Sequence, residues 1–160
     1  MQKVITNLWF DTQAEEAAGF YTSLMPNSAI TKVTRYGHAG AEVSGMPEGT
    51  VLTVAFTLDG QSFIAINGGP VFQFTPAISL MISCQSQAEI DSLWDAFGRE
   101  GEPGECGWIT DKYGLSWQIV PEEMNRMLED PDPARVERVN SAMLKMKKLD
   151  VEGLRRAYEG

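Results

Sequence analysis

The side chains that most often carry catalysis or bind metals are sparse in this sequence of 160 residues. The one histidine, His38, lies in a glycine-rich segment, residues 37–49, and the two cysteines, Cys84 and Cys106, do not form a CxxC motif. A histidine-based triad or a zinc site needs several such groups to converge on one point. We therefore expect neither chemistry from these residues, and we expect Cys84 to be a buried structural thiol.

Neutral polar and aromatic side chains offer a different chemistry, the binding of a small molecule. Side chains alternate between the two faces of a strand, and in the predicted strands at 4–10, 77–83 and 115–120 one face is the more apolar. That face should pack beneath helices, and the other then carries the mixture of apolar and hydrogen-bonding groups that a small-ligand site requires. With nearby aromatic and amide side chains added, the predicted ligand-binding residues are Asn7, Trp9, Asn67, Phe72, Phe74, Ser79, Met81, Trp108 and Gln118.

Several of these residues also have a structural interpretation. Asn67 precedes a Gly-Gly-Pro sequence, where an asparagine is expected to form a turn rather than to contact a ligand. Phe72 and Phe74 either wall a binding cup or hold two parts of the chain together, and the sequence leaves both readings open. Trp9 and Trp108 are, in the same way, either ligand contacts or residues that fill core or interface space.

The first half of the chain predicts the order β-α-β-β-β. A helix should begin at Thr12, because Thr12-Gln-Ala-Glu15 has the spacing of a capping box, and Pro26 should end it. Asp59-Gly60 is typical of a two-residue hairpin turn. Four glycines and a proline between residues 37 and 49 predict an exposed, mobile loop. The predicted strands are residues 4–10, 29–36, 50–58 and 61–67.

The second half begins in the same way. Ser86-Gln-Ala-Glu89 repeats the capping-box spacing ahead of a second amphipathic stripe. Asp111 is expected to bond the backbone of the turn between the last two strands, and Trp117 is expected to pack in the core. The repeated succession of strand, cap and stripe predicts a duplicated unit. The predicted strands of this half are residues 77–83, 107–110 and 115–120.

The composition changes beyond Pro121, where we expect only helices. These are predicted at residues 122–129 and 134–149, with a short last helix capped by Asp150. Their apolar stripes are rich in methionine, an adaptable side chain, and cover either the domain's own sheet or a second copy of the chain; we favour the second copy. The methionines concerned are Met124, Met127, Met143 and Met146.

Local motifs along nearly the whole chain resemble a known family. The chain is similar to the vicinal oxygen chelate superfamily (glyoxalase/bleomycin-resistance/dioxygenase), and in particular to its PhnB-like branch, often labelled 3-demethylubiquinone 3-methyltransferase-like. The motifs are Leu8-Trp9-Phe10-Asp11, Asn67-Gly68-Gly69-Pro70, Cys84-Gln85, Asp111-Lys112-Tyr113-Gly114 and Ser116-Trp117-Gln118.

The resemblance implies an α+β fold in which two βαβββ modules curl around a cup, and it implies a homodimer. We accordingly predict a paired domain over residues 1–121, with modules at about 3–67 and 77–121, and a C-terminal helical extension at 122–160. Whether the cup lies within one chain or between two is left open.

Metal-dependent members of the superfamily place four ligands on the cup-facing side of four strands. Laid on this chain, that pattern falls on Ile5, Ile64, Ala77 and Gln118, of which only Gln118 has an atom that coordinates metals. We therefore predict no metal and no other cofactor. The methyltransferase label finds no support either, because Gly68-Gly69 precedes a proline and not the helix of an adenosyl-binding motif.

The amino-acid composition limits the classes of partner that the chain is expected to bind. A formal net charge of −9 disfavours nucleic acids and anionic membranes, whose binding depends on lysine and arginine. Two cysteines do not read as a disulfide framework, and no apolar run approaches the length that spans a bilayer or has the form of a leader. We expect a cytoplasmic protein in a reducing compartment.

The predicted function is the metal-independent binding of a small, partly apolar molecule, for sequestration or sensing. One alternative is an enzyme, either a metal-dependent lyase or dioxygenase of the superfamily or a methyltransferase as the family label suggests. Another is a structural or interaction protein whose cup is filled by its own side chains. The fold alone does not choose among them, because one fold hosts several chemistries.

Overall fold

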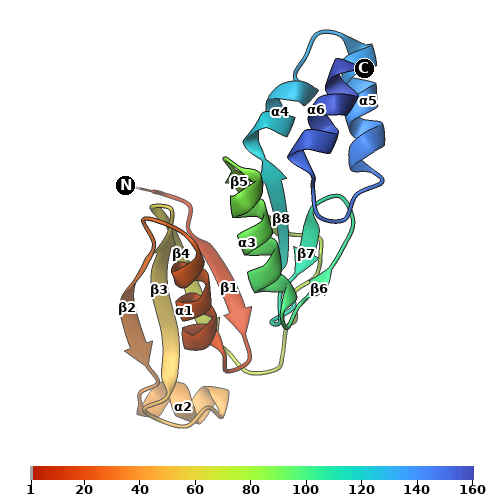
Figure 1. Ribbon diagram of the computed structural model, residues 1–160. Helices are drawn as coiled ribbons and strands as arrows, with labels where there is room; N and C mark the ends of the chain where they lie inside the picture. Colours follow the sequence, from red (N-terminus) through yellow and green to blue (C-terminus); the bar gives the residue numbers. More distant parts are fainter. Residues whose placement is uncertain (1) are drawn as a thin grey trace. The chain divides into compact units, whose positions relative to one another are not determined.

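The computed structural model describes residues 2–160, which form two compact units, one ending at Phe74 and one beginning at Thr75. Each unit contains a four-stranded mixed sheet with a helix packed on it (Figure 1). The predicted α+β fold of two βαβββ modules is thereby confirmed. The helices after Pro121 belong to the second unit.

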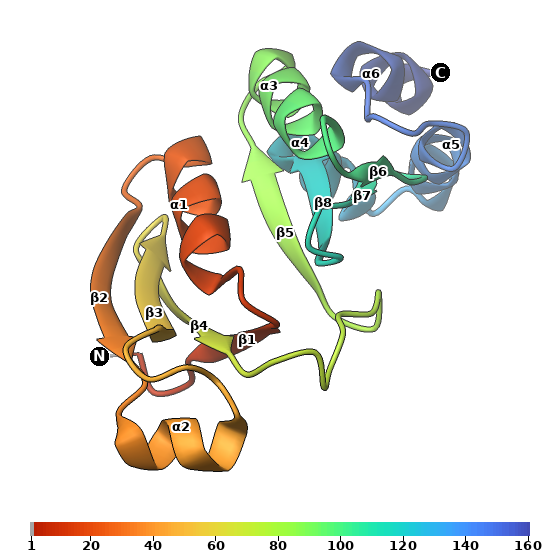
Figure 2. The ribbon, with the colours of Figure 1, turned by 90° about the horizontal axis from the view of Figure 1, so that it is seen from below.

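The first unit has a sheet in the order β1-β4-β3-β2, with α1 on one face (Figure 2). Strand β1 runs parallel to β4, whereas β3 is antiparallel to both β2 and β4. Its elements are β1 (Thr6–Phe10), α1 (Ala14–Leu24), β2 (Ala29–Arg35), α2 (His38–Ser44), β3 (Val51–Leu58) and β4 (Gln61–Asn67).

The core of the first unit lies between α1 and the sheet. The buried face of α1 carries three alanines and Tyr21, and small side chains let a helix approach a sheet closely. Tyr21 meets Phe56 with ring centroids 6.4 Å apart, and Phe56 stacks on Phe63 at 5.4 Å. The alternation of β3 and β4 places these rings on the α1 side, so the other face of the sheet stays open.

One turn and one helix cap of the first unit test the sequence-based prediction. The hairpin at Asp59-Gly60 is confirmed, since both residues adopt the positive φ (44° and 77°) that a type I′ turn requires. The predicted cap of α1 is wrong, because the helix begins at Ala14 and its cap position, Gln13, makes no side-chain cap bond. The Ala14 N–H instead donates to Oδ1 of Asn67, 2.8 Å away.

The segment 37–49 is not simply a loop, which corrects the prediction. It contains the short helix α2, which begins after Gly37 and ends at Gly45 in the left-handed conformation (φ 76°). Glycine is common at the N-cap of a helix and just after its C-terminus, and the prediction took these glycines for loop residues. All of α2 is exposed or half-buried, and backbone bonds of Tyr36 to Thr50 and Gly49 close its base.

The second unit repeats the arrangement, with the sheet order β5-β8-β7-β6 and β5 parallel to β8. The N-cap of α3 at Ser86 is confirmed, because its Oγ accepts a bond from the Glu89 N–H at 3.2 Å, whereas Oε2 of Glu89 accepts from the Gln85 N–H at 2.7 Å and not from Ser86. The two-residue strand β6 was absent from the prediction. The elements are β5 (Ser79–Cys84), α3 (Gln87–Gly98), β6 (Glu102–Pro103), β7 (Trp108–Thr110) and β8 (Ser116–Pro121).

Buried aromatic and acidic groups organise the second unit beneath α3. Trp117 stacks on Phe97 with centroids 4.8 Å apart, and its indole N–H donates to Oδ2 of Asp111 at 2.9 Å. Oδ1 of Asp111 accepts bonds from the backbone N–H groups of Tyr113 and Leu115. The predicted roles of Asp111 in its turn and of Trp117 in the core are both confirmed.

The C-terminal helices pack on one another and on the end of β8. They are α4 (Glu122–Leu128), α5 (Pro133–Met143) and α6 (Val151–Glu159), and the predicted cap at Asp150 is confirmed. The predicted helix at 134–149 is too long. It ends at Met143, where the backbone tightens into the turns Lys145 N–H to Ala142 and Met146 N–H to Met143, and the carbonyls of Met146 and Lys147 then accept bonds from Cys106 and Gly107.

The methionines of these helices do not form a free apolar face. Met124 and Met127 are buried in a cluster with Val120, Val139, Leu149 and Leu154, and Met143 and Met146 pack against the same cluster. The expectation that they pack against a second copy is therefore wrong. An amphipathic stripe has the same pattern whichever surface covers it, so the pattern alone did not reveal the partner.

Within residues 2–160, no helix combines the length and the apolar character needed to cross a membrane.

Candidate functional site

The open face of the second sheet brings together four of the predicted ligand-binding residues. The strand register pairs Met81 of β5 with Gln118 of β8, and Gln118 in turn with Trp108 of β7. Paired residues point to the same face, so the three side chains form a row across the sheet. Nε2 of Gln118 donates to Oγ of Ser79 at 2.9 Å, which joins the row to the neighbouring position of β5.

This row, Met81-Gln118-Trp108 with Ser79, lies on the face opposite α3, because the neighbouring residue Trp117 packs against that helix. Met81 is 54% exposed, although it is a large apolar side chain in the middle of a strand. Gln118 and Trp108 are half-buried. The row therefore presents a thioether, an amide and an indole side by side.

One end of this open face is covered by the C-terminal helices. Val120 faces the same side as Gln118, and it is buried in the cluster with Met124 and Met127. Beyond the row at the other end, Ser116 is 2% exposed and pairs with Ser79 and Thr110. On this face Met81 and Ser83 of β5 are exposed, and Ser79, Trp108 and Gln118 are half-buried.

The open face of the first sheet has a similar mixture. Strand register places Asn7 beside Ile64, and Trp9 beside Ile66, which in turn pairs with Thr53. Asn7 is exposed, and its Nδ2 donates to the carbonyl of Ile5. Ile66 and Thr53 were absent from the predicted site, although the alternation of side chains along residues 50–58 and 61–67 indicates that they face the same side.

Trp9 is held rigidly at one end of this face. Its indole N–H donates to the carbonyl of Gly69 at 3.0 Å, and Phe72 meets its ring edge-on at 5.0 Å. The ring lies so close to Gly68 that a Cβ atom there would stand 2.0 Å from Cζ2 of Trp9. Phe72 is 62% exposed, so the pair forms an aromatic corner that is partly open to solvent.

Asn67 and Phe74 are engaged elsewhere. Asn67 is buried, with Oδ1 accepting from Ala14 N–H, Nδ2 donating to the carbonyl of Val51 at 3.1 Å, and its own carbonyl accepting from the Tyr36 hydroxyl at 2.5 Å. Phe74 packs edge-on against Phe10, at 5.2 Å. These contacts give both residues a structural role in holding the first unit together.

Comparison with known proteins identifies the family. A model of the family described as 3-demethylubiquinone-9 3-methyltransferase matches residues 2–120, most of the chain. The chain belongs to this family. The predicted membership of the PhnB-like branch of the vicinal oxygen chelate superfamily is confirmed. Helices α4, α5 and α6 lie outside the matched residues.

Solved structures agree with this assignment. A PhnB protein from Bacillus cereus is 39% identical, with a TM-score of 0.67, and the match covers 75% of this chain and 99% of that one. A protein from Pseudomonas aeruginosa is 17% identical, with a TM-score of 0.61 over 76% of this chain and 98% of that one, and shows the fold alone. None of the curated proteins matches the chain.

The side chains of this PhnB-like chain do not fit a divalent metal. Of the four positions that correspond to the superfamily's ligands, Ile64 and Gln118 lie on open faces, whereas Ile5 and Ala77 precede β1 and β5. Only Gln118 has a donor atom, and one amide oxygen does not hold Zn, Mn, Fe or Ni. Among residues 2–160, no three His, Cys, Asp or Glu side chains are grouped to bind a metal.

Strand β5, which carries Met81 and Ser79, also carries Cys84, and the surroundings of this thiol make it unreactive. Cys84 is buried as predicted, and burial, with a further contribution from Glu89, raises the pKa of its thiol to about 12, although a bond with the Val120 backbone opposes the shift. Such a thiol stays protonated and unreactive at neutral pH. His38 is exposed on α2 and lies 3.6 Å from Glu48.

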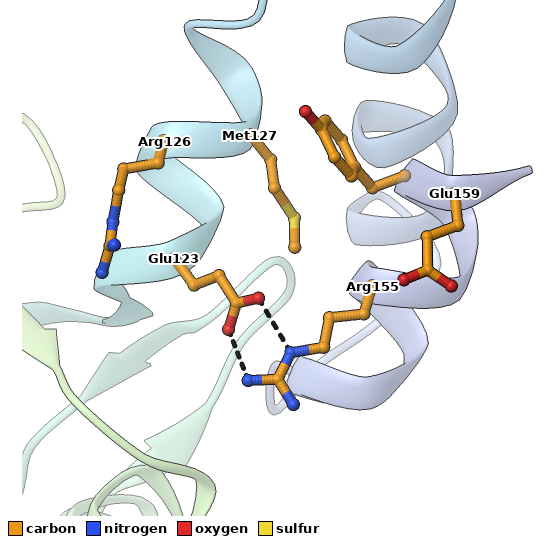
Figure 3. Close-up of a pocket in the computed structure, with 6 residues that line it drawn as sticks. Glu123, Arg126, Met127, Arg155 and Glu159 are labelled. Carbon is orange, nitrogen blue, oxygen red and sulfur yellow. Dashed lines mark hydrogen bonds and ion pairs between the residues drawn. The ribbon is translucent and has the colours of Figure 1, made fainter.

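A hollow of about 550 Å³ lies among the C-terminal helices (Figure 3). Glu123 of α4 and Arg155 of α6 reach toward each other and form a two-pronged ion pair, with N–O distances of 2.8 and 2.7 Å. That bond holds the pKa of the Glu123 carboxyl below its usual value. Because the two charges are paired with each other, we interpret this ion pair as a contact that holds α4 against α6, and we do not interpret the hollow as a ligand site.

Proposed function

We propose that this PhnB-like chain is a metal-independent small-molecule binding protein that sequesters or senses its ligand. The observation that carries the proposal is the row Met81-Gln118-Trp108 with Ser79 on the open face of the second sheet. Apolar bodies around a few fixed polar groups are the usual composition of a ligand site. The corner of Trp9 and Phe72 on the first sheet is a second surface of the same character.

The donor chemistry supports binding over metal-dependent catalysis. A lyase or dioxygenase of the metal-dependent kind needs several imidazole or carboxylate ligands, and the corresponding positions here carry isoleucine, alanine and one amide. The segments that connect a strand to the following helix also disfavour the methyltransferase activity named in the family's description. Neither residues 11–13, between β1 and α1, nor residues 85–86, between β5 and α3, contain the glycines that cradle an adenosyl cofactor.

The exposure of Met81 supports binding over a filled, purely structural sheet face. Within its unit, the side chain is 54% exposed instead of packing over the neighbouring strand. Met81 lies beside the oriented amide of Gln118, and apolar groups next to a few fixed polar groups are the usual composition of a ligand site. The free state of both cysteines agrees with our proposal of a reducing, cytoplasmic location.

The proposal is tested by titrating a chemically broad fragment library into isotope-labelled protein. We expect saturable shifts of the Trp108 indole, the Met81 methyl and the Gln118 amide signals. Gln118→Leu should weaken the same fragments, whereas Gln61→Leu, the same change at an exposed strand position of the first unit, should not. Absence of shifts at these signals for every fragment contradicts the proposal.

We also propose that the chain forms a homodimer, as its family resemblance implies. The C-terminal methionines give this proposal no support, since they are used inside the second unit. Light scattering at micromolar concentration tests it directly. A strictly monomeric species contradicts it.

A further inference from the structure

We infer that the ligand of the second sheet is an uncharged, planar aromatic molecule with one amide-like hydrogen-bonding group, bound with its ring between Met81 and Trp108 and its polar group on Gln118. This inference rests on the proposed function and narrows it to one chemical class.

The flanks of the row select for an aromatic ring. Strand register fixes Met81 and Trp108 on either side of Gln118, one position away in each direction. A methionine sulfur contacts aromatic rings favourably, and an indole stacks on them or meets their edges. Because Met81 is exposed and unbranched, its side chain can adapt to the thickness of a ring.

The centre of the row selects for a single polar group. Gln118 is the middle residue, and its Nε2 is oriented by the bond to Oγ of Ser79. A primary amide has two N–H groups and a carbonyl oxygen, so one N–H and Oε1 remain to meet a ligand. A ligand amide offers the matching acceptor and donor at the same spacing.

The charges around the row select against an anion. Strands β5, β7 and β8 contain no lysine or arginine, and the acidic residue of β6, Glu102, pairs with Thr110 one position further along the sheet. An anion placed on the row would lose water without gaining a cationic partner, which is unfavourable. The net charge of −9 adds a repulsive field around the whole chain.

Three matched probes test the requirements for an aromatic ring and for the absence of charge, and the Gln118 variants below test the requirement for the amide. Benzamide has the ring and the neutral amide, benzoate replaces the amide by a carboxylate of the same shape, and cyclohexanecarboxamide keeps the amide but removes the aromatic ring. Each is titrated into labelled full-length protein, and the signals of Trp108, Met81 and Gln118 are followed. We expect benzamide to shift all three, with benzoate about tenfold weaker and cyclohexanecarboxamide about threefold to tenfold weaker.

Variants locate the binding. Gln118→Leu and Gln118→Met should each weaken benzamide by about threefold to tenfold, while Gln61→Leu should leave it unchanged. Gln118 is only half-buried, so its variants are expected to fold, and their circular dichroism and dispersed amide spectra check this. Equal loss in Gln61→Leu overturns the inference, because the effect is then not local to the row.

The outcomes separate this inference from the proposed function. Benzoate or cyclohexanecarboxamide binding at the row as tightly as benzamide overturns the ligand class but keeps a binding site. Failure of all three probes to shift the row signals overturns the class as well, and the fragment titration then decides whether the row binds any other molecule. Preferential binding of benzamide that depends on Gln118 supports the inference.

Discussion

Removing the side chain of Asn67 should destabilise the first unit without abolishing ligand binding. Asn67→Ala removes the acceptor for Ala14 N–H, at 2.8 Å, and the donor to the Val51 carbonyl, at 3.1 Å. Losing a helix cap costs about 0.5–2 kcal/mol, and losing the second bond costs about 0.5–1.5 kcal/mol. Since Ala14 is fully buried, water does not replace its lost partner, and we expect a total of about 3 kcal/mol.

Asn67→Asp separates the two contributions through its pH dependence. It keeps the oxygen that caps α1, but at neutral pH it buries a carboxylate whose second oxygen faces the Val51 carbonyl, so we expect a cost at least as large as that of Asn67→Ala. In acid the protonated carboxyl again donates to Val51, and the cost should become smaller.

The assay is urea unfolding followed by fluorine NMR of 5-fluorotryptophan. Of the four tryptophans, Trp9 alone lies in the first unit, so its signal reports that unit separately from the second. A loss below about 0.5 kcal/mol in Asn67→Ala refutes the capping role. Loss of fragment binding at Gln118 in a variant that remains folded also refutes it, because Asn67 would then belong to the ligand site.

Three further predictions follow from individual contacts. Gly68→Ala should cost about 1–3 kcal/mol or displace the Trp9 indole, because the added Cβ would stand 2.0 Å from the ring; an unchanged indole signal and an unchanged unfolding midpoint contradict this. In native protein at pH 8, a thiol reagent should modify one cysteine and spare Cys84, whose thiol has a pKa of about 12, and rapid modification of both is the opposing result. Glu123→Gln should cost up to about 1 kcal/mol at neutral pH. Arg155 lowers the pKa of this carboxyl below 4.5, so the ion pair stabilises the fold above that pH and the difference between variant and parent should vanish in acid; a difference that persists at low pH contradicts the assignment.

Local patterns predicted those parts of the fold whose causes are local. The helix cap at Ser86 and the turn at Asp59-Gly60 each depend on a few neighbouring residues, and both appear at the predicted positions. The cap of α1 was missed because it comes from Asn67, 53 residues along the chain from Ala14. The sequence around Thr12 has the spacing of a local cap, and the prediction used that spacing instead. A contact between residues so far apart in the chain produces no local sequence pattern from which it could be predicted.

The candidate site was predictable to the extent that strand alternation is regular. Alternation placed Ser79, Met81 and Gln118 on one face, and the register confirms that they share it. Trp108 joins them through the pairing of a three-residue strand, too short to show a pattern of its own. Asn67 and Phe74 entered the prediction through a motif, whereas their contacts with Ala14 and Phe10 are tertiary.

Binding at the row should need no metal, and a chelation experiment tests this expectation most directly. Benzamide and the best fragments are titrated into protein stripped with a chelator, and again after addition of Mn, Fe, Ni or Zn, while the Trp108 and Gln118 signals are followed. We predict saturable shifts in the stripped protein and the same affinity after metal addition. Binding that occurs only once a metal is added, with that metal retained at one ion per chain after desalting, would contradict the account.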